Sequence, residues 1–296
     1  PGGGFPTLAG ANGDEMLIQF FNLSPVIDTV PAAQLDIFAT NASETISITD
    51  GPIYGGDQTA TVSAVTFESY SFANKTRVTV NALDGADTFV LNYSLQVPGL
   101  ELLDLYGNEL TGGLLETDDA AGETFQILAT GPGTTANRMY GQNGAELFTN
   151  NLTRYLDPIQ SNVQMHGQAG NSIIDLSDIN DPTGDIITVE GNKIVGAAPG
   201  AIELYFATIE DVRFEATSGD DIITILSTFA PFKYRISGGP GSDVFRIGSY
   251  DQDPSPAVSL AWAPYASGAN TIGQIKGELT IVPGPASDTG VDDLYI

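Results

Sequence analysis

A short motif recurs along most of this chain, and its spacing constrains the fold more than any other feature. The motif is a small residue, any residue, an acid, any residue and a large apolar residue, followed by a run of β-forming residues. Copies span residues 13–17, 42–46, 85–89, 144–148, 170–174, 219–223, 241–245 and 290–294, and a shortened copy spans 122–125. The copies that begin at residues 122, 144, 170, 219, 241 and 290 are separated by 22, 26, 49, 22 and 49 residues, which are one or two multiples of about 24.

Each part of the motif has a physical role at a turn. Glycine gives the turn a positive φ or lets another backbone approach closely. The acid two residues later is placed to accept hydrogen bonds from backbone amides of the turn, although serine replaces it at Ser172. The apolar residue then opens a strand of period two, whose inward side chains stack on those of neighbouring strands. We expect such inward ladders to include Phe89, Phe125, Phe148 and Phe245.

A turn-plus-strand unit that returns at roughly 20–30 residues is typical of a chain that stacks coil upon coil. The sequence therefore predicts an all-β, right-handed parallel β-helix, or β-solenoid, that spans residues 1–296 as one elongated domain. Segments 107–121 and 250–270 interrupt the pattern and are predicted side loops. The alternative is a tandem of antiparallel β-sandwich domains, which also have short strands and Gly, Pro or Asp turns. The solenoid is favoured because the acidic turn precedes its strand at a similar phase each time.

Charge and composition exclude several classes of function. Acidic residues number 37 against 10 lysines and arginines, giving a net charge of −27, which disfavours nucleic acid and anionic membranes as partners. No apolar run approaches the roughly 20 residues of a membrane helix, so no membrane insertion is expected. The charge attracts divalent cations, and we expect salt or Ca²⁺ to raise stability. The absence of cysteine excludes thiolate catalysis and cysteine-ligated metals.

One copy of the motif carries a family resemblance. Residues 238–246, Gly-Gly-Pro-Gly-Ser-Asp-Val-Phe-Arg, resemble the nine-residue repeat of hemolysin-type (RTX) calcium-binding β-rolls, and segments 10–17 and 141–148 are weaker versions. The longer cadence is similar to the β-helical repeat regions of very large bacterial surface and adhesin-type proteins. The resemblance implies an extracellular or cell-surface location. It departs from the β-roll in that its copies lie at least 22 residues apart, so a shared Ca²⁺ needs acids from adjacent coils.

Calcium is the only cofactor that the sequence suggests. The candidate ligands are the acids of the predicted turns: Asp87, Asp220, Asp221, Asp243, Asp292 and Asp293. Ca²⁺ takes six to eight oxygens, so isolated carboxylates need neighbours and backbone carbonyls. The competing interpretation is that these acids cap their turns and remain solvated. Sequons at Asn41, Asn74, Asn92 and Asn151 are candidate glycosylation sites, which would mark a secretory route.

Catalytic residues are not recognisable, so we expect no enzyme. The single histidine, His166, is interpreted as a turn or surface residue, and no serine elbow is present. The basic residues do not cluster in the sequence, whereas a lyase needs them together. Many β-helices act on polysaccharides, so a lyase or hydrolase is the third hypothesis, by analogy of fold alone.

The favoured function is a structural subunit or segment of an extracellular fibre, stalk or surface layer. Its partners are other copies, joined head to tail, or further repeats of the same chain, because residue 296 falls within a coil and a cut coil exposes a strand edge. The second hypothesis is an adhesin-type module that binds carbohydrate or a cell surface.

Overall fold

The computed structural model describes residues 7–9, 15–17, 25–107, 110–111, 114–115, 122–141, 144–167, 171–205, 209–248, 272–284 and 290–295. Regular structure in these ranges is β-strand apart from one 3₁₀ turn, η1 (Ile272–Gln274). Two large sheets hold almost every strand, and the all-β class predicted from the sequence is confirmed. Within the described ranges, no helix has the length and apolar character needed to span a membrane.

The larger sheet, sheet A, has 13 strands. In order across the sheet they are β2 (Glu15–Leu17), β1 (Thr7–Ala9), β4 (Ala32–Phe38), β8 (Lys75–Asn81), β10 (Leu102–Tyr106), β14 (Ala136–Tyr140), β16 (Val163–His166), β20 (Ile202–Tyr205), β19 (Lys193–Val195), β18 (Ile186–Glu190), β22 (Ile222–Ile225), β24 (Val244–Ile247) and β26 (Asp293–Tyr295).

The second sheet, sheet B, has 11 strands. In order they are β25 (Glu278–Val282), β23 (Lys233–Ser237), β21 (Ile209–Glu215), β17 (Ser172–Ser177), β15 (Leu147–Thr149), β13 (Thr124–Ala129), β9 (Thr88–Asn92), β5 (Thr45–Tyr54), β6 (Asp57–Ser63), β7 (Tyr70–Phe72) and β3 (Val26–Asp28). A separate antiparallel pair, β11 (Leu110–Thr111) and β12 (Leu114–Leu115), lies within the predicted side loop 107–121, whereas segment 250–270 lies outside the described residues.

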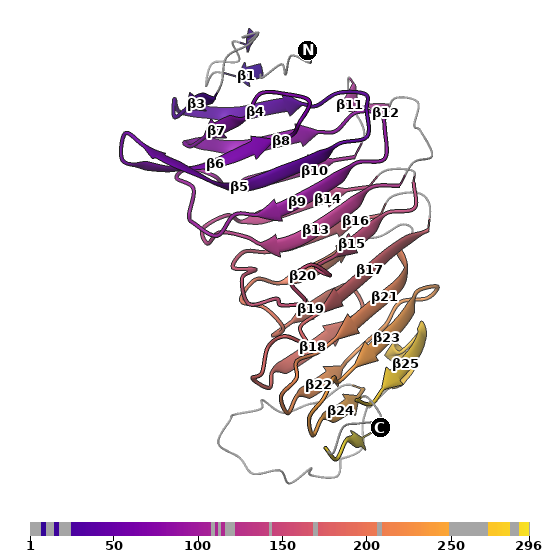
Figure 1. Cartoon of the computed structure of the whole chain (residues 1–296). Coiled ribbons are helices and arrows are strands. Elements are labelled where there is room, and N and C mark those ends of the chain that lie inside the picture. Colours follow the sequence, from indigo (N-terminus) through magenta and orange to yellow (C-terminus); the bar gives the residue numbers. More distant parts are fainter. Residues whose placement is uncertain are drawn as a thin grey trace.

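The chain passes back and forth between the two sheets and advances along one axis, as the colour sequence from indigo to yellow shows (Figure 1). Strands that neighbour each other in a sheet are mostly parallel, for example β8, β10, β14 and β16 in sheet A. Parallel pairing of this kind is not expected in a tandem of antiparallel β-sandwich domains. Antiparallel pairing joins β1 to β2 and β4, and two three-stranded meanders, β5–β6–β7 and β18–β19–β20, bring it into the two large sheets.

The core lies between the sheets and consists of columns of in-register side chains. One column of sheet B contains Ile46, Phe89, Phe125, Phe148, Ile174, Val212, Tyr234 and Leu279. The rings of Phe89 and Phe125 stack with centroids 5.2 Å apart, and those of Phe125 and Phe148 with centroids 5.0 Å apart. The predicted ladder of these three phenylalanines is confirmed. Phe245 also occupies an inward column, but in sheet A, beside Ile223 and Leu294.

The motif changes its place in the coil halfway along the chain, which the sequence did not indicate. Copies from residue 42 to residue 174 precede strands of sheet B, whereas copies from residue 219 precede strands of sheet A, as the first copy does at β2. The interpretation of the 49-residue steps as two coils is therefore wrong. Between β24 and β26 the chain visits sheet B once, at β25, so the step from Gly241 to Gly290 is one coil that carries a long connection.

Candidate functional site

The acid positions of the motif copies from residue 42 onward, where Ser172 takes the place of one acid, stand together with Asp185 in two columns at the corners where the chain passes between the sheets. The first corner column is Glu44, Asp87, Glu123, Glu146 and Ser172, at the entry to strands of sheet B. The second corner column is Asp185, Asp221, Asp243 and Asp292, at the entry to strands of sheet A. The two columns are the structural counterpart of the sequence motif.

Corner acids accept hydrogen bonds from the backbone of the preceding corner acid. Asp87 Oδ1 accepts from the Glu44 amide at 2.7 Å, and Asp243 Oδ1 accepts from the Asp221 amide at 2.9 Å. Asp292 Oδ1 repeats this with the Asp243 amide at 3.1 Å. Each carboxylate therefore satisfies an amide at the place where the chain turns and the ladder of a sheet does not reach.

Glycines of the motif make room for this stacking. A Cβ on Gly219 would collide with the backbone nitrogen of Gly184, and one on Gly241 would collide with the carbonyl of Gly219. Gly290 stands in the same relation to Gly241. Gly241 also has a φ of 139°, a backbone angle that residues with a side chain rarely adopt. Close approach of successive corners is thus the reason for glycine at this point of the motif.

The six predicted calcium ligands do not converge. Asp87 belongs to the first corner column, whereas Asp221, Asp243 and Asp292 occupy successive places in the second. Asp87, Asp221 and Asp243 are almost fully buried, so they cap the corners as the competing interpretation held but are not solvated. Asp220 is exposed and Oδ1 accepts from the Ser242 amide at 2.8 Å, and Asp293 is exposed on β26.

Three other acids do converge, and they are the single such group in the part of the chain that the structure describes. Asp178, Asp181 and Asp185 lie on the connection between β17 and β18, with one carboxylate oxygen of each within 4.8 Å of the others. The motif does not include them, because all three lie between its copies at residues 170–174 and 219–223. Their spacing, three acids within eight residues beside Pro182 and Gly184, was the available signal.

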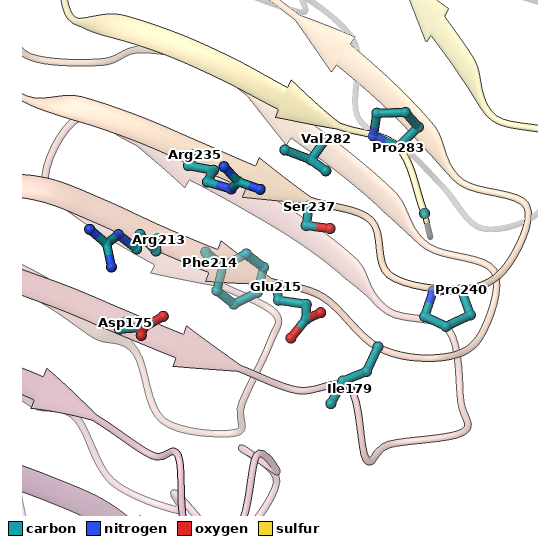
Figure 2. Close-up of a pocket in the computed structure, with 11 residues that line it drawn as sticks. Asp175, Ile179, Arg213, Phe214, Glu215, Arg235, Ser237, Pro240, Val282 and Pro283 are labelled. Carbon is teal, nitrogen blue, oxygen red and sulfur yellow. The ribbon is translucent and has the colours of Figure 1, made fainter. Parts of the chain in front are cut away.

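The outer face of sheet B carries a hollow of about 430 Å³, drawn in Figure 2. Its lining comes from strands β17, β21, β23 and β25 and the turns that follow them: Asp175, Ile179, Arg213, Phe214, Glu215, Arg235, Ser237, Pro240, Val282, Pro283 and Gly284. Asp175, Arg213 and Arg235 are in register on neighbouring strands. We call this hollow the sheet B pocket.

The two arginines give the sheet B pocket its chemistry. Arg213 is held by Asp211, with Nη2 2.6 Å from Oδ2. Arg235 is exposed and makes no hydrogen bond or ion pair with any described residue. A free guanidinium in a hollow suits a carboxylate or sulfate, which it binds through two parallel hydrogen bonds. The sequence prediction that basic residues do not cluster missed this pair, because Arg213 and Arg235 are one 22-residue coil apart.

His166 belongs to a stack of rings on the outer face of sheet A, not to a turn. Its ring lies 4.3 Å from that of Tyr140, which lies 4.5 Å from that of Tyr106. Burial lowers the pKa of His166 to about 4, the positive charge of Arg138 lowers it further, and the negative charge of Asp104 opposes both. His166 is therefore neutral at physiological pH.

The candidate glycosylation sites have different surroundings. Asn41, Asn92 and Asn151 are exposed. The side-chain amide of Asn74 donates to Thr29 O at 3.0 Å and to Asp57 Oδ2 at 2.8 Å, and a glycan on that nitrogen would disturb both bonds.

Comparison of the chain with protein-family models, curated proteins and solved structures found no match.

Proposed function

We propose that this chain is a stiff structural segment of an extracellular fibre, stalk or surface layer, folded as a right-handed parallel β-solenoid. The observation that carries the proposal is the eight-membered column from Ile46 to Leu279, which continues in register along sheet B. Stacking of this kind gives a chain length and stiffness without a large globular core.

The corners and the meanders support a mechanical role. Both sheets extend through nearly all the described strands, and the meanders fill places in the sheets instead of interrupting them. Corner acids bond adjacent coils outside the sheet ladders. Bending such a stack requires many parallel hydrogen bonds to lengthen together.

The last described coil leaves core-type surface uncovered. Leu294 continues the column of Ile223 and Phe245, yet 55% of its surface is exposed, and β26 and β25 are outer strands of their sheets. Unpaired parallel edges favour the addition of another strand. We propose that further repeats of the same chain, or a second copy in head-to-tail contact, cover this end. A head-to-tail contact produces an open filament.

Negative-stain electron microscopy of the native material, with and without EDTA, tests the proposal. We expect rods or filaments of uniform width, whose length is a multiple of one chain when copies join. Loss of filaments in EDTA would place a divalent cation at the contacts. Compact globular particles would overturn the structural role, and single short rods in both conditions would overturn self-assembly.

The sheet B pocket favours a second candidate function, a surface-binding module for an acidic carbohydrate. We expect a uronic-acid oligosaccharide to bind wild type in calorimetry and Arg235→Ala to weaken it about tenfold, the usual worth of one charge-assisted contact. Lys233→Ala is the matched control, because it removes the same charge from the same strand outside the pocket. Equal loss in both variants would reduce the effect to general electrostatics, and cleavage of the oligosaccharide would instead support the lyase or hydrolase hypothesis.

A further inference from the structure

The connection between β17 and β18, residues 178–185, lies where the first corner column ends and the second begins. It carries Asp178, Asp181 and Asp185, whose nearest carboxylate oxygens lie within 4.8 Å of one another. Asp178 is fully buried, 3% of Asp181 is exposed, and Asp185 is half-buried. Two carboxylates are thus withdrawn from water, and a third partly so, at one point of a strongly acidic chain.

Two oxygens of this group lack a hydrogen-bond partner. Asp178 Oδ1 accepts from the Leu156 amide at 2.7 Å, but Oδ2 is buried and has no partner among the described residues. Oδ2 of Asp185 is buried and unpartnered in the same way. Neither carboxylate forms an ion pair with a described lysine or arginine. Buried charges without a partner are strongly unfavourable, so the group needs a counterion or a proton.

The local backbone fixes the third member of the group. Asp181 Oδ1 accepts from the Thr183 amide at 2.8 Å and from the Thr183 hydroxyl at 2.5 Å. The Asp181 carbonyl accepts from the amide and the hydroxyl of Ser218, both at 2.8 Å. The second corner column fixes Asp185, whose amide donates to Asp221 Oδ1 at 2.6 Å. The loop is therefore held before any ligand arrives.

We infer that Asp178, Asp181 and Asp185 form a binding site for one Ca²⁺ ion. The donors are all oxygen atoms, which suits a hard cation. Two oxygens on opposite sides of a Ca²⁺ ion lie about 4.8 Å apart, twice its usual bond length of about 2.4 Å. That value is the upper limit of the spacing here, so one ion can reach all three carboxylates. Water completes the coordination shell on the side of half-buried Asp185.

The electrostatics agree with this geometry. Burial raises the pKa of Asp178 to about 7, and the negative charges of Asp185, Asp181 and Asp157 add to the increase. Burial likewise raises the pKa of Asp185 to about 6, with Asp221, Asp181 and Asp157 adding to it. The carboxylates repel one another when ionised, and a divalent cation is the ligand that reverses this repulsion. The competing state is a shared proton with no ion.

Calorimetric titration of the EDTA-stripped chain with CaCl₂ in 0.15 M NaCl distinguishes the two states. We expect wild type to bind one Ca²⁺ per chain above the weak binding of a surface with a charge of −27, and to melt at a higher temperature in Ca²⁺. The double variant Asp178→Asn with Asp185→Asn should lose that single site and the Ca²⁺-dependent rise in melting temperature. Asp185→Asn alone should weaken the site at least tenfold.

Two comparisons separate loss of the site from loss of the fold. The variant Asp220→Asn with Asp293→Asn makes the same change in charge at two exposed acids and should keep the site. Without Ca²⁺, the double variant at 178 and 185 should melt no lower than wild type, because the amide keeps the bond to Leu156 and the buried charge is gone. The inference would be overturned if wild type bound no Ca²⁺ at millimolar concentration, or if the double variant at 178 and 185 bound Ca²⁺ as tightly as wild type.

Discussion

Asp243 shows how one corner residue stabilises the fold. Its side chain is fully buried and accepts from the Asp221 amide, and its own amide donates to Asp292. The motif predicted an acid bonded to backbone at a turn, and this is confirmed. Asp221 accepts from the Thr217 amide of its own turn at 3.0 Å, as the motif predicted, whereas the bond from Asp243 reaches the amide of Asp221 in a neighbouring turn, which the motif did not predict. Sequence separation hides that partner, because the two acids are 22 residues apart.

Replacement of Asp243 by alanine should therefore lower stability by about 1–3 kcal/mol, since the buried Asp221 amide loses its acceptor. Urea unfolding of the purified chain measures this loss. Asp243→Asn keeps an acceptor oxygen and should lose less. Asp220→Ala, at an exposed acid, should cost under about 1 kcal/mol. Equal losses at residues 220 and 243 would contradict the corner role.

His166 makes stability depend on pH. Its pKa is about 4 in the folded chain and near its ordinary value of 6.5 when unfolded, so the unfolded chain binds the proton first as pH falls. The free energy of unfolding should therefore fall from about pH 6.5 to about pH 4 and level off below. Relative to His166→Phe, wild type should lose up to about 3 kcal/mol over this window. If the free energies of unfolding of the two proteins changed in parallel with pH, the lowered pKa of His166 would be refuted.

At the scale of the element, the sequence predicted strands and ladders but not their order. The apolar positions of period two place Phe89, Phe125 and Phe148 correctly because burial selects them. The meanders were missed, since their strands share the period and composition of the parallel ones. The sequence also did not predict that the motif moves from the corner before sheet B to the corner before sheet A. The motif records a turn followed by a strand, and not which sheet that strand enters.

The phenylalanine ladder allows a test of the in-register column. Phe125→Ala removes a ring stacked on both sides and should cost about 3–5 kcal/mol, because the cavity lies between fixed strands. Phe125→Leu should cost less than half of that. Denaturant titration measures both values. A loss below 1 kcal/mol for the alanine variant would mean that the column is loosely packed.

The whole molecule carries a charge of −27, and its ten basic residues cannot neutralise it. Raising NaCl from 10 to about 300 mM shortens the screening length to under about 10 Å and should raise the melting temperature, by roughly 2–4 °C for each 1 kcal/mol gained. Near pH 4, where many carboxyls are protonated, the increase should shrink. A melting temperature that falls with salt would show that ion pairs dominate over repulsion.

The candidate sites were less predictable than the fold. Composition predicted cation attraction, but the motif directed attention to Asp221 and Asp243, which serve the corners. Convergence at Asp178 and Asp185, and the pairing of Arg213 with Arg235, depend on which coils become neighbours. That information is not contained in local spacing.

The two sheets advance together along one axis, and in the proposed β-solenoid this arrangement determines how the chain would yield to tension (Figure 1). The hydrogen bonds between coils lie along the direction of pull and are loaded one coil after another, so the chain would unravel turn by turn. The corner bonds set the length that each turn releases: 22 residues between Asp221 and Asp243, and 49 between Asp243 and Asp292. At about 3.4 Å per residue, these are extensions of about 75 Å and about 170 Å. If the chain serves as the structural segment proposed above, it would absorb a sudden load in unequal steps and not break at once.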